Sequence, residues 1–427
     1  MSAELSQSPS TLLLSAADID NAAQRIAPVV TPTPLQLSDR LSEITRAQVY
    51  LKREDLQIVR SYKLRGAYNL LVQLSDEEIG AGVVCSSAGN HAQGFAYACR
   101  ALGVHGRVYV PNKTPQQKLD RIRYHGGKFI ELIVGGSTYD LAAEAALDDV
   151  QRTGATLVPP YDDLRTIAGQ GTIAVELLSQ LDSEPDLVVV PVGGGGCIAG
   201  ITTYLAERTA NTAVLGVEPA GAAAMIAALA AGEPVTLDHV DQFVDGAAVK
   251  RAGTLTHAAL AAAGDMVSIT TIDEGAVCTA MLDLYQNEGI IAEPAGALSV
   301  AGLLEADVEP GSTVVCLVSG GNNDVSRYGE VLERSLVHLG LKHYFLVDFP
   351  QEPGALRRFL DEVLGPNDDI TLFEYVKRNN RATGEALVGI QLGSSADLDG
   401  LLARMRATEI HVETLQPGSP AYRYLLL

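Results

Sequence analysis

The chain has 427 residues, with 31 basic and 52 acidic side chains and a formal charge of −21. Hydrophobic cores stop growing at roughly 250–300 residues, so a chain of this length is expected to fold as about two or three units. The negative net charge excludes non-specific binding to nucleic acid, because the protein would repel the phosphates. A membrane-spanning helix is also excluded, because no apolar run approaches the ~20 residues that span a bilayer. The N-terminus lacks the basic and apolar regions of a signal peptide, so we expect a cytoplasmic protein.

The five cysteines predict buried thiols. Their number is odd, their spacing is wide and no CxxC pair occurs, whereas disulfide frameworks and zinc sites use even or clustered sets. Most of them stand in apolar segments, which indicates packing as small hydrophobic side chains.

The first part of the chain alternates strands with helices. After a serine-rich start, apolar spacing predicts a helix within residues 18–30, which the following TPTP segment ends because proline has no N–H to donate. The expected strands are then 48–51, 83–85, 107–110, 128–134 and 156–158, and the expected helices are 90–102, 115–124 and 137–152. This alternation is typical of a parallel sheet with helical crossovers.

The alternation resumes after residue 165. The segment 187–192 is continuously apolar, as a strand buried on both faces requires. Further strands are expected at 213–217 and 313–319, with helices at 198–208 and 220–231. The pattern therefore predicts an α/β fold with two parallel-sheet lobes, the first inserted into the second. We assign residues 1–335 to this region, with a large lobe over 1–63 and 163–335 and a small lobe over 64–162.

The pattern of apolar and polar residues changes near residue 340. Alternating segments predict strands, and apolar spacing predicts two helices, the first with proline in its first turn and glycine after its end. The expected strands are 343–349, 370–377, 386–392 and 412–415, and the expected helices are 353–364 and 398–406. The order β-α-β-β-α-β is that of a ferredoxin-like α+β domain, which we place at residues 340–427.

Four polar, glycine-rich segments are candidates for a ligand site. They are SYKLRGA at 61–67, SSAGNH at 86–91, GGGG at 193–196 and SGGN at 319–322. Each begins near the C-terminal end of a predicted strand or just before a helix, and ligands of open α/β sheets bind at that edge.

The GGGG turn indicates a phosphate site. Glycines let backbone N–H groups approach an anion, and the start of the following helix adds partial positive charge. The turn has neither the GK[ST] of a Walker loop nor the G-x-G-x-x-G of a dinucleotide site. Lys63 is a candidate nucleophile, because a lysine amine drawn into such a pocket loses pKa by desolvation.

Together the four segments resemble the set carried by the tryptophan-synthase-β-like, or fold type II, pyridoxal-phosphate enzymes. Within these, the match is closest to the threonine dehydratases (threonine ammonia-lyases) of the biosynthetic type, which have a regulatory tail. The resemblance covers residues 20–427, and four motifs in this order and spacing are specific in combination.

The resemblance implies a role for each motif. Lys63 would hold pyridoxal phosphate as a Schiff base, and Tyr62 would lie against the ring where the family usually has phenylalanine. Asn90 would hydrogen-bond the 3′ oxygen of the ring, Ser319 would face the pyridine nitrogen, and Glu293 would lie nearby. The N–H groups for the phosphate would belong to Gly193, Gly194, Gly195, Gly196 and Cys197. The loop for the substrate carboxylate would consist of Ser86, Ser87, Ala88 and His91.

The implied reaction is dehydration and deamination of L-threonine to 2-oxobutanoate and ammonia, the first step of isoleucine biosynthesis. Two other enzymes remain as alternatives. In the related serine racemases a serine stands at the position of Ala88, and a methyl group cannot carry a proton, so Ala88 favours dehydration. A catabolic serine/threonine dehydratase would lack the tail.

Metal binding near Glu218 is not expected for a divalent ion. Related racemases bind such an ion near a motif resembling Val217–Glu218–Pro219, but here three alanines follow at 222–224. Hard cations need several oxygen ligands, so at most a monovalent ion would suit Glu218 and backbone carbonyls.

The tail resembles an ACT-like amino-acid-sensing domain in the segment FPQEPGAL at 349–356. Relatives with such tails are inhibited by isoleucine, and some are released by valine. The length allows a single module, so a module from a neighbouring subunit of a homotetramer or dimer would complete an effector site. Two alternatives stay open: the tail only holds an oligomer together, or the whole chain is an amino-acid-binding regulator on an inactive enzyme scaffold.

Overall fold

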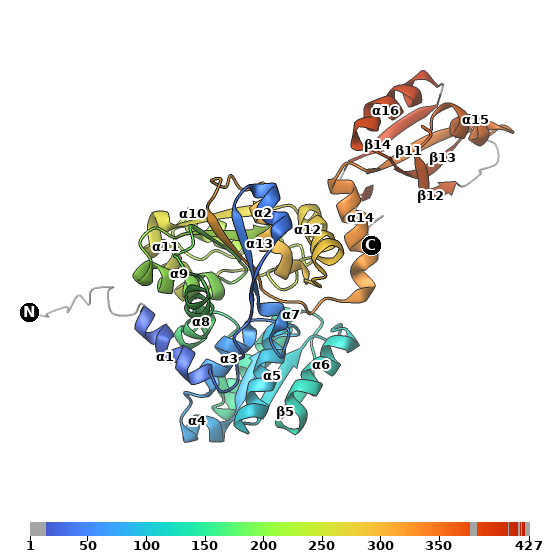
Figure 1. Cartoon of the computed structure of the whole chain (residues 1–427). Helices are drawn as coiled ribbons and strands as arrows, with labels where there is room; N and C mark the ends of the chain where they lie inside the picture. Colours follow the sequence, from blue (N-terminus) through green and yellow to red (C-terminus); the bar gives the residue numbers. More distant parts are fainter. Residues whose placement is uncertain (1–13, 376–381, 409, 417–418, 420, 423–427) are drawn as a thin grey trace, which may run out of the picture. The chain divides into compact units, whose positions relative to one another are not determined.

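Figure 1 shows the computed structural model of the chain. It describes residues 14–375, 382–408, 410–416, 419, 421 and 422. The chain divides into two compact units, Met1–Asn323 and Asp324–Leu427. The expected boundary at 335–340 falls within α14 (Tyr328–His338) and the turn that follows this helix.

The small lobe of the first unit is a parallel four-stranded sheet. Its strands β3 (Val83–Ser86), β4 (Gly106–Val110), β5 (Ile130–Val134) and β6 (Thr156–Leu157) lie in the order β5-β4-β3-β6. The crossover helices are α5 (Asn90–Leu102), α6 (Gln116–Gly126) and α7 (Tyr139–Thr153). The helix α5 ends as predicted at Gly103, which adopts the left-handed conformation that glycine tolerates.

The large lobe is a six-stranded sheet in the order β1-β2-β10-β7-β8-β9. Its strands are β1 (Leu35–Leu37), β2 (Gln48–Arg53), β7 (Leu187–Pro191), β8 (Ala213–Pro219), β9 (Val267–Ile272) and β10 (Thr313–Val318), and β1 alone runs antiparallel to its neighbour. The small-lobe strands come between β2 and β7 in the chain. The predicted insertion of one parallel lobe into another is therefore confirmed.

Helices cover the sheet of the large lobe. They are α1 (Ala16–Ile26), α2 (Asp39–Thr45), α8 (Leu164–Gln180), α9 (Gly196–Arg208), α10 (Ala224–Ala231), α11 (Thr254–Ala263), α12 (Glu274–Glu288) and α13 (Pro294–Glu305). Two further helices, α3 (Lys63–Leu71) and α4 (Asp76–Ala81), lead into the small lobe. The main apolar core lies between β7 and β10 of the sheet and the helices α1, α8 and α9.

The second unit has an antiparallel four-stranded sheet in the order β12-β13-β11-β14. The strands are β11 (Lys342–Pro350), β12 (Asp369–Tyr375), β13 (Thr383–Gln391) and β14 (His411–Leu415), and the helices are α15 (Ala355–Glu362) and α16 (Leu398–Ala407). Phe345, Phe349 and Phe359 are central to its core. This βαββαβ order confirms the predicted ferredoxin-like fold.

Three expected elements differ in detail. The helix predicted from 353 begins at Ala355, because Gly354 takes the N-cap with φ +91° and leaves Pro353 outside the helix. The helix predicted over 220–231 is divided into a short turn and α10. The strand predicted over 370–377 is β12, and its last two expected residues lie outside the described ones. The sequence patterns also missed β9, α12 and α13, which are apolar or mixed without clear periodicity.

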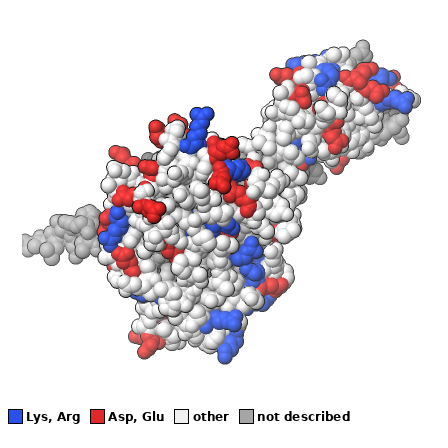
Figure 2. All heavy atoms as spheres, viewed as in Figure 1, with Lys and Arg blue, Asp and Glu red and all other residues white. Residues whose placement is uncertain are grey.

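The surface and the buried thiols agree with the composition. On the face shown in Figure 2, basic and acidic side chains are interspersed, without a continuous basic surface. All five cysteines are free and buried, as predicted. Among the described helices, none is long and apolar enough to cross a membrane.

Candidate active site

Lys63 is the first residue of α3, at the junction of the two lobes. The segment before it is tied to the end of β10: Ser61 forms a β-bridge with Gly320, and the Tyr62 N–H donates to Ser319 O at 3.2 Å. On the other side, α5 packs closely against the start of α3, since a Cβ on Gly94 would lie 2.9 Å from Leu64 N. The position of Lys63 is thus set by both lobes.

The Lys63 amine is withdrawn from solvent. Its Nζ donates to Pro160 O at 3.1 Å and lies 5.2 Å from the centroid of the Tyr62 ring. Burial lowers the pKa of Lys63 to about 8. About a tenth of the amine is therefore unprotonated at pH 7, and this fraction can act as a nucleophile or base.

The glycine turn between β7 and α9 forms an anion cradle. The first backbone hydrogen bond of α9 runs from Ala199 N to Gly195 O, so the earlier N–H groups of its first turn have no acceptor within the helix. Gly195 has φ +90°, and a Cβ on Gly194 would lie 2.3 Å from the Tyr161 ring. A side chain at either position would distort the turn, so the glycines keep these donors accessible.

This cradle fits the phosphate of pyridoxal phosphate. Free N–H groups and the positive end of a 13-residue helix face the same turn. Cys197, in the first turn of the helix, adds no competing charge, because burial raises the pKa of its thiol to about 12. Lys63 supplies the amine to which the aldehyde of the cofactor would be joined.

Asn90 is the first residue of α5, and both polar atoms of its side-chain amide form hydrogen bonds. Its Nδ2 donates to Glu293 Oε1 at 2.5 Å, and its Oδ1 accepts from Asn322 Nδ2 at 2.8 Å. Burial, together with nearby Asp245, raises the pKa of Glu293 to about 7. Three of the resemblance's residues, on three elements, therefore lie together at this point: Asn90, Glu293 and the SGGN segment.

The loop from Ser86 to His91 offers donors of two kinds. Ser86 Oγ is buried without a hydrogen-bond partner among the described residues, and the loop's backbone leads into the first turn of α5. The His91 ring donates from Nε2 to Val158 O at 2.8 Å, and burial together with Lys63 lowers its pKa to about 4. The neutral ring can then only accept at Nδ1, so a carboxylate would meet the backbone N–H of His91 rather than its side chain.

Ser319 lies at the end of β10, as expected. Its hydroxyl donates to Ala295 O at 3.2 Å. A hydroxyl can rotate to another acceptor, so this geometry is compatible with donation to a pyridine nitrogen, and it offers no charge to hold that nitrogen protonated.

Glu218 acts as a cap on α10. Its two carboxylate oxygens accept from Met225 N and Ile226 N, each at 2.8 Å, and burial raises its pKa to about 7. Across the described part of the chain, no group of three His, Cys, Asp or Glu side chains is arranged to hold a metal ion.

Several residues of the site were missed by the sequence patterns. Pro160 and Tyr161 follow the end of β6 and contact Lys63 and the glycine turn, and Thr256 Oγ1 donates to Gly194 O at 2.7 Å. Asp162 caps α11 by accepting from Thr254 N and Leu255 N. The PPYDD segment directly follows a strand of a parallel sheet. Because ligands of such sheets bind at the C-terminal ends of the strands, this position was the signal that could have identified the segment.

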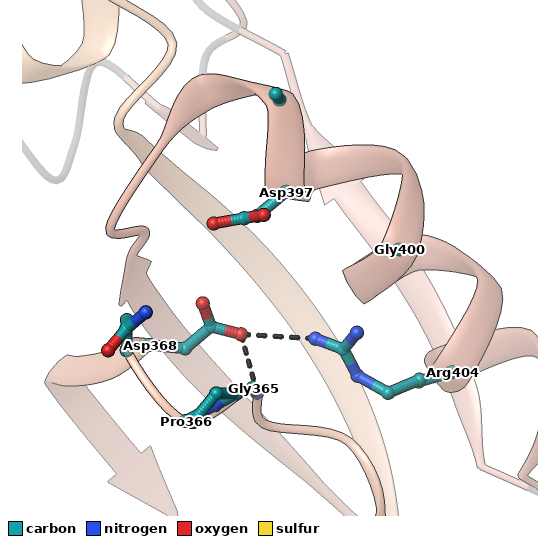
Figure 3. Close-up of a pocket in the computed structure, with 8 residues that line it drawn as sticks. Gly365, Pro366, Asp368, Asp397, Gly400 and Arg404 are labelled. Atoms are coloured by element: carbon teal, nitrogen blue, oxygen red, sulfur yellow. Dashed lines mark hydrogen bonds and ion pairs between the residues drawn. The ribbon is translucent and has the colours of Figure 1, made fainter.

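The second unit contains a polar hollow of about 190 Å³ (Figure 3). Asp397 and Gly400 line it from the start of α16, and Asp368 bonds there to Arg404 Nη2 at 3.1 Å and to Gly365 N at 2.7 Å. Its lining is polar, with two carboxylates. The branched aliphatic side chain of isoleucine would find little apolar surface there.

Comparison with known proteins gives two family matches. Residues 26–320 match the family described as pyridoxal-phosphate dependent enzyme, and residues 333–425 match the C-terminal regulatory domain of threonine dehydratase. The chain is 90% identical over 429 residues to "L-threonine dehydratase biosynthetic IlvA" of Mycobacterium tuberculosis, with 100% of both chains covered.

Solved structures share the fold of the first unit. Processed threonine deaminase isoform 2 of Solanum lycopersicum is 36% identical with a TM-score of 0.70, over 76% of this chain and 95% of that chain. Maize serine racemase is 30% identical with a TM-score of 0.69, over 76% and 98%. Since a deaminase and a racemase share this fold, the residues of the site must decide the reaction.

Proposed function

The chain belongs to the pyridoxal-phosphate-dependent enzyme family, and we propose that it is a threonine ammonia-lyase that converts L-threonine to 2-oxobutanoate and ammonia in isoleucine biosynthesis. The observation that carries this assignment is the juxtaposition of Lys63, the glycine cradle and Asn90 in a chain whose second unit matches the threonine dehydratase regulatory domain. The resemblance seen in the sequence is thereby confirmed.

When bound, pyridoxal phosphate supplies an electron sink for the electrons of the substrate Cα–H bond. The protein binds and orients the reactants. The turn of Gly193, Gly194, Gly195, Gly196 and Cys197 would bind the cofactor phosphate, and Asn90 would donate to the 3′ oxygen of the ring. Backbone N–H groups and hydroxyls of the Ser86–His91 loop would bind the substrate carboxylate, and Tyr62 would lie beside the ring.

Lys63 is the base in this assignment. Its lowered pKa leaves the amine able to take the Cα proton near neutral pH. Pro160 O accepts from Nζ at 3.1 Å and holds the free amine beside the glycine turn. The β-hydroxyl then leaves with this proton as water, and the released enamine is hydrolysed through its imine to 2-oxobutanoate and ammonia.

Two residues favour elimination over racemisation. Ala88 places a methyl group where an acid/base hydroxyl would be needed on the opposite face of Cα. Ser319 offers a neutral hydroxyl to the pyridine nitrogen, so the sink is weaker and the charge at Cα has a shorter lifetime. These residues oppose the serine racemase alternative, which the shared fold leaves open.

We propose that the ferredoxin-like domain of the second unit, residues 340–427, is the sensor for isoleucine, with valine as an antagonist, and that the enzyme is a cytoplasmic homotetramer. The single βαββαβ module per chain supports an effector site completed by a second copy. The regulatory family of residues 333–425 supports the sensing role.

The direct test follows 2-oxo acid production from L-threonine. The Lys63→Ala variant should lose activity by at least about 10³-fold, because both its base and its cofactor linkage are removed. Lys113→Ala is the matched control, since this lysine is exposed. Full activity in Lys63→Ala would reject the assignment, and wild-type protein that neither binds cofactor nor deaminates would support the inactive-scaffold alternative.

Regulation is tested by rate-versus-threonine curves with and without isoleucine. A rightward, sigmoidal shift would support the sensor, and its partial reversal by valine would support antagonism. A hyperbolic curve indifferent to isoleucine would leave the second unit with a structural role only.

A further inference from the structure

Asn322, the last residue of the SGGN segment, links the site's asparagine to the backbone. Its Nδ2 donates one hydrogen to Val59 O at 2.8 Å and the other to Asn90 Oδ1 at 2.8 Å. Asn90 Nδ2 in turn donates to Glu293 Oε1 at 2.5 Å. The four groups form one chain of hydrogen bonds beside the Lys63 segment.

The direction of this chain is determined at Val59. A backbone carbonyl can only accept, so the amide of Asn322 must present its NH₂ group to Val59. The same NH₂ group faces Asn90, and only the oxygen of Asn90 can accept from it. The NH₂ group of Asn90 is therefore turned toward Glu293 and the cofactor side, and its orientation follows from polarity alone.

Glu293 supports this orientation from the other end, but less firmly. A carboxylate accepts only, whereas a protonated carboxyl can also donate, and the pKa of Glu293 is raised to about 7. Near neutral pH, Glu293 therefore tolerates either orientation of Asn90 in part of the molecules. The anchor that does not change with pH is the pair formed by Asn322 and Val59 O.

We propose that Asn322 is a positioning residue that fixes the amide orientation of Asn90, so that the cofactor's 3′ oxygen meets an N–H donor and not a carbonyl oxygen. The proposal rests on the proposed function through the role of Asn90. An N–H donor stabilises a negatively charged 3′ oxygen, whereas a carbonyl oxygen at the same place would repel it.

Asn322→Asp is the sharpest test, because it keeps size and removes both donated hydrogens. The new carboxylate can only accept, so Asn90 is driven to turn its NH₂ group toward residue 322 and its oxygen toward the cofactor. Asn323→Asp is the matched control: it adds the same charge one residue later, at an amide whose Nδ2 donates to Ala292 O at 3.4 Å.

The readouts are the affinity of the apoenzyme for pyridoxal phosphate, by absorbance titration, and the absorption band of the bound cofactor, which reports the charge of its 3′ oxygen. Asn322→Asp should weaken affinity by about ten- to a hundredfold, the effect of a hydrogen bond to a charged group, and shift the band toward the form with a neutral 3′ oxygen. Asn323→Asp should change affinity by less than about threefold and leave the band in place.

A second variant separates positioning from folding. In Asn322→Asp/Glu293→Gln, the glutamine amide can donate to the reversed Asn90 oxygen, so the melting temperature should recover while cofactor affinity stays low. Recovery of both together would assign Asn322 a purely structural role and overturn the proposal, as would unchanged affinity and band in Asn322→Asp. Failure of the proposed function is distinguishable, because it would appear in wild-type protein as absence of threonine deamination whatever the cofactor band shows.

Discussion

At the scale of single residues, burial brings the ionisable groups of the site toward their neutral forms. It lowers the pKa of Lys63 to about 8 and of His91 to about 4, and it raises the pKa of Glu293 to about 7. The Lys63 amine gains reactivity from this shift, and His91 loses the capacity to carry charge. A site for two anions thus holds few charges of its own and binds largely through N–H groups.

Glu293→Gln should reveal the buried carboxyl in the pH dependence of stability. The pKa of Glu293 is raised in the folded state from about 4.3, so its contribution to stability is complete below that pH and is lost as pH rises through about 7. Relative to wild type, the variant apoenzyme should gain about 3 kcal/mol in free energy of unfolding between about pH 5 and pH 9. Urea unfolding across this range measures the difference.

The control for this prediction is Glu131→Gln, at an exposed position on β5. Its difference from wild type should stay nearly constant over the same range. If the Glu293→Gln difference were equally flat, Glu293 would not titrate between its unfolded and folded values, and the burial argument would be wrong.

Ala88→Ser should open the racemisation path. The substitution adds a hydroxyl to a half-buried loop position next to Ser87, and a positioned acid/base group contributes about 10²–10⁴-fold to proton transfer. With L-serine as substrate, D-serine formation should rise at least about tenfold over wild type, as measured by chiral chromatography. Loss of the new activity in Lys63→Ala/Ala88→Ser would show that it uses the same site, and no D-serine from Ala88→Ser would contradict the role given to the methyl group.

Site residues could be predicted from the sequence where they belong to a recognisable motif. Residues that join the site only through a tertiary contact could not be predicted. Lys63, Asn90 and the glycine turn are visible as strand-end motifs. Tyr161 belongs to the site because its ring packs against Gly194. Asn322 belongs to the site because its side chain donates to a carbonyl 263 positions earlier in the chain. Such pairings depend on tertiary packing, which no local pattern records.

At the scale of elements, the start of α3 depends on a buried network of charges. Arg65 is fully buried and donates to both oxygens of Glu54, at 2.8 and 2.7 Å, and to Glu176 at 2.7 Å. Lys52 donates to the same Glu176 at 2.7 Å. The network joins β2, α3 and α8 two residues after Lys63, so it fixes the helix turn from which Lys63 projects.

Arg65→Met should destabilise the first unit strongly. It removes the partner of Glu54, and breaking a buried pair costs about 3–5 kcal/mol because the remaining charge is uncompensated. Calorimetry should show a lower melting temperature for the first unit. Adding Glu54→Gln should restore part of the loss, and Arg123→Ala, an exposed arginine on α6, should change stability by less than about 0.5 kcal/mol. A melting temperature unchanged by Arg65→Met would contradict the role of the network.

Helices and strands whose sequences contain a capping residue or a clear apolar pattern were predicted well. Those whose sequences lack such signals were not. The bounds of α5 follow from its spacing and Gly103, and β7 follows from its apolar run. α13 is almost entirely buried, so its sequence is apolar on all sides and shows no helical period. The start of α15 was placed too early at Pro353, because proline is common in the first turn of a helix. In the structure Gly354 is the N-cap, so the helix begins after it.

At the scale of the whole molecule, the chain carries one unit of the pyridoxal-phosphate-dependent enzyme family and one regulatory domain of the threonine dehydratase type. A single module presents one βαββαβ surface, and the hollow within it is polar. In one copy, this hollow therefore offers an apolar effector such as isoleucine little apolar surface. Pairing of two modules is the arrangement that would supply more apolar lining.

Isoleucine should therefore strengthen self-association of the enzyme. A ligand that binds only the paired modules shifts the equilibrium by linkage, by about 100-fold per site when its concentration is about 100 times its dissociation constant. Sedimentation velocity of dilute holoenzyme should show a shift toward the larger species on addition of isoleucine, and L-leucine at equal concentration tests for a general solvent effect. Asp397→Asn, which removes one of the two carboxylates that line the polar hollow, should leave the shift intact. Isoleucine that inhibits the enzyme equally at all protein concentrations, or a shift abolished by Asp397→Asn, would place the effector within one module and contradict the paired site.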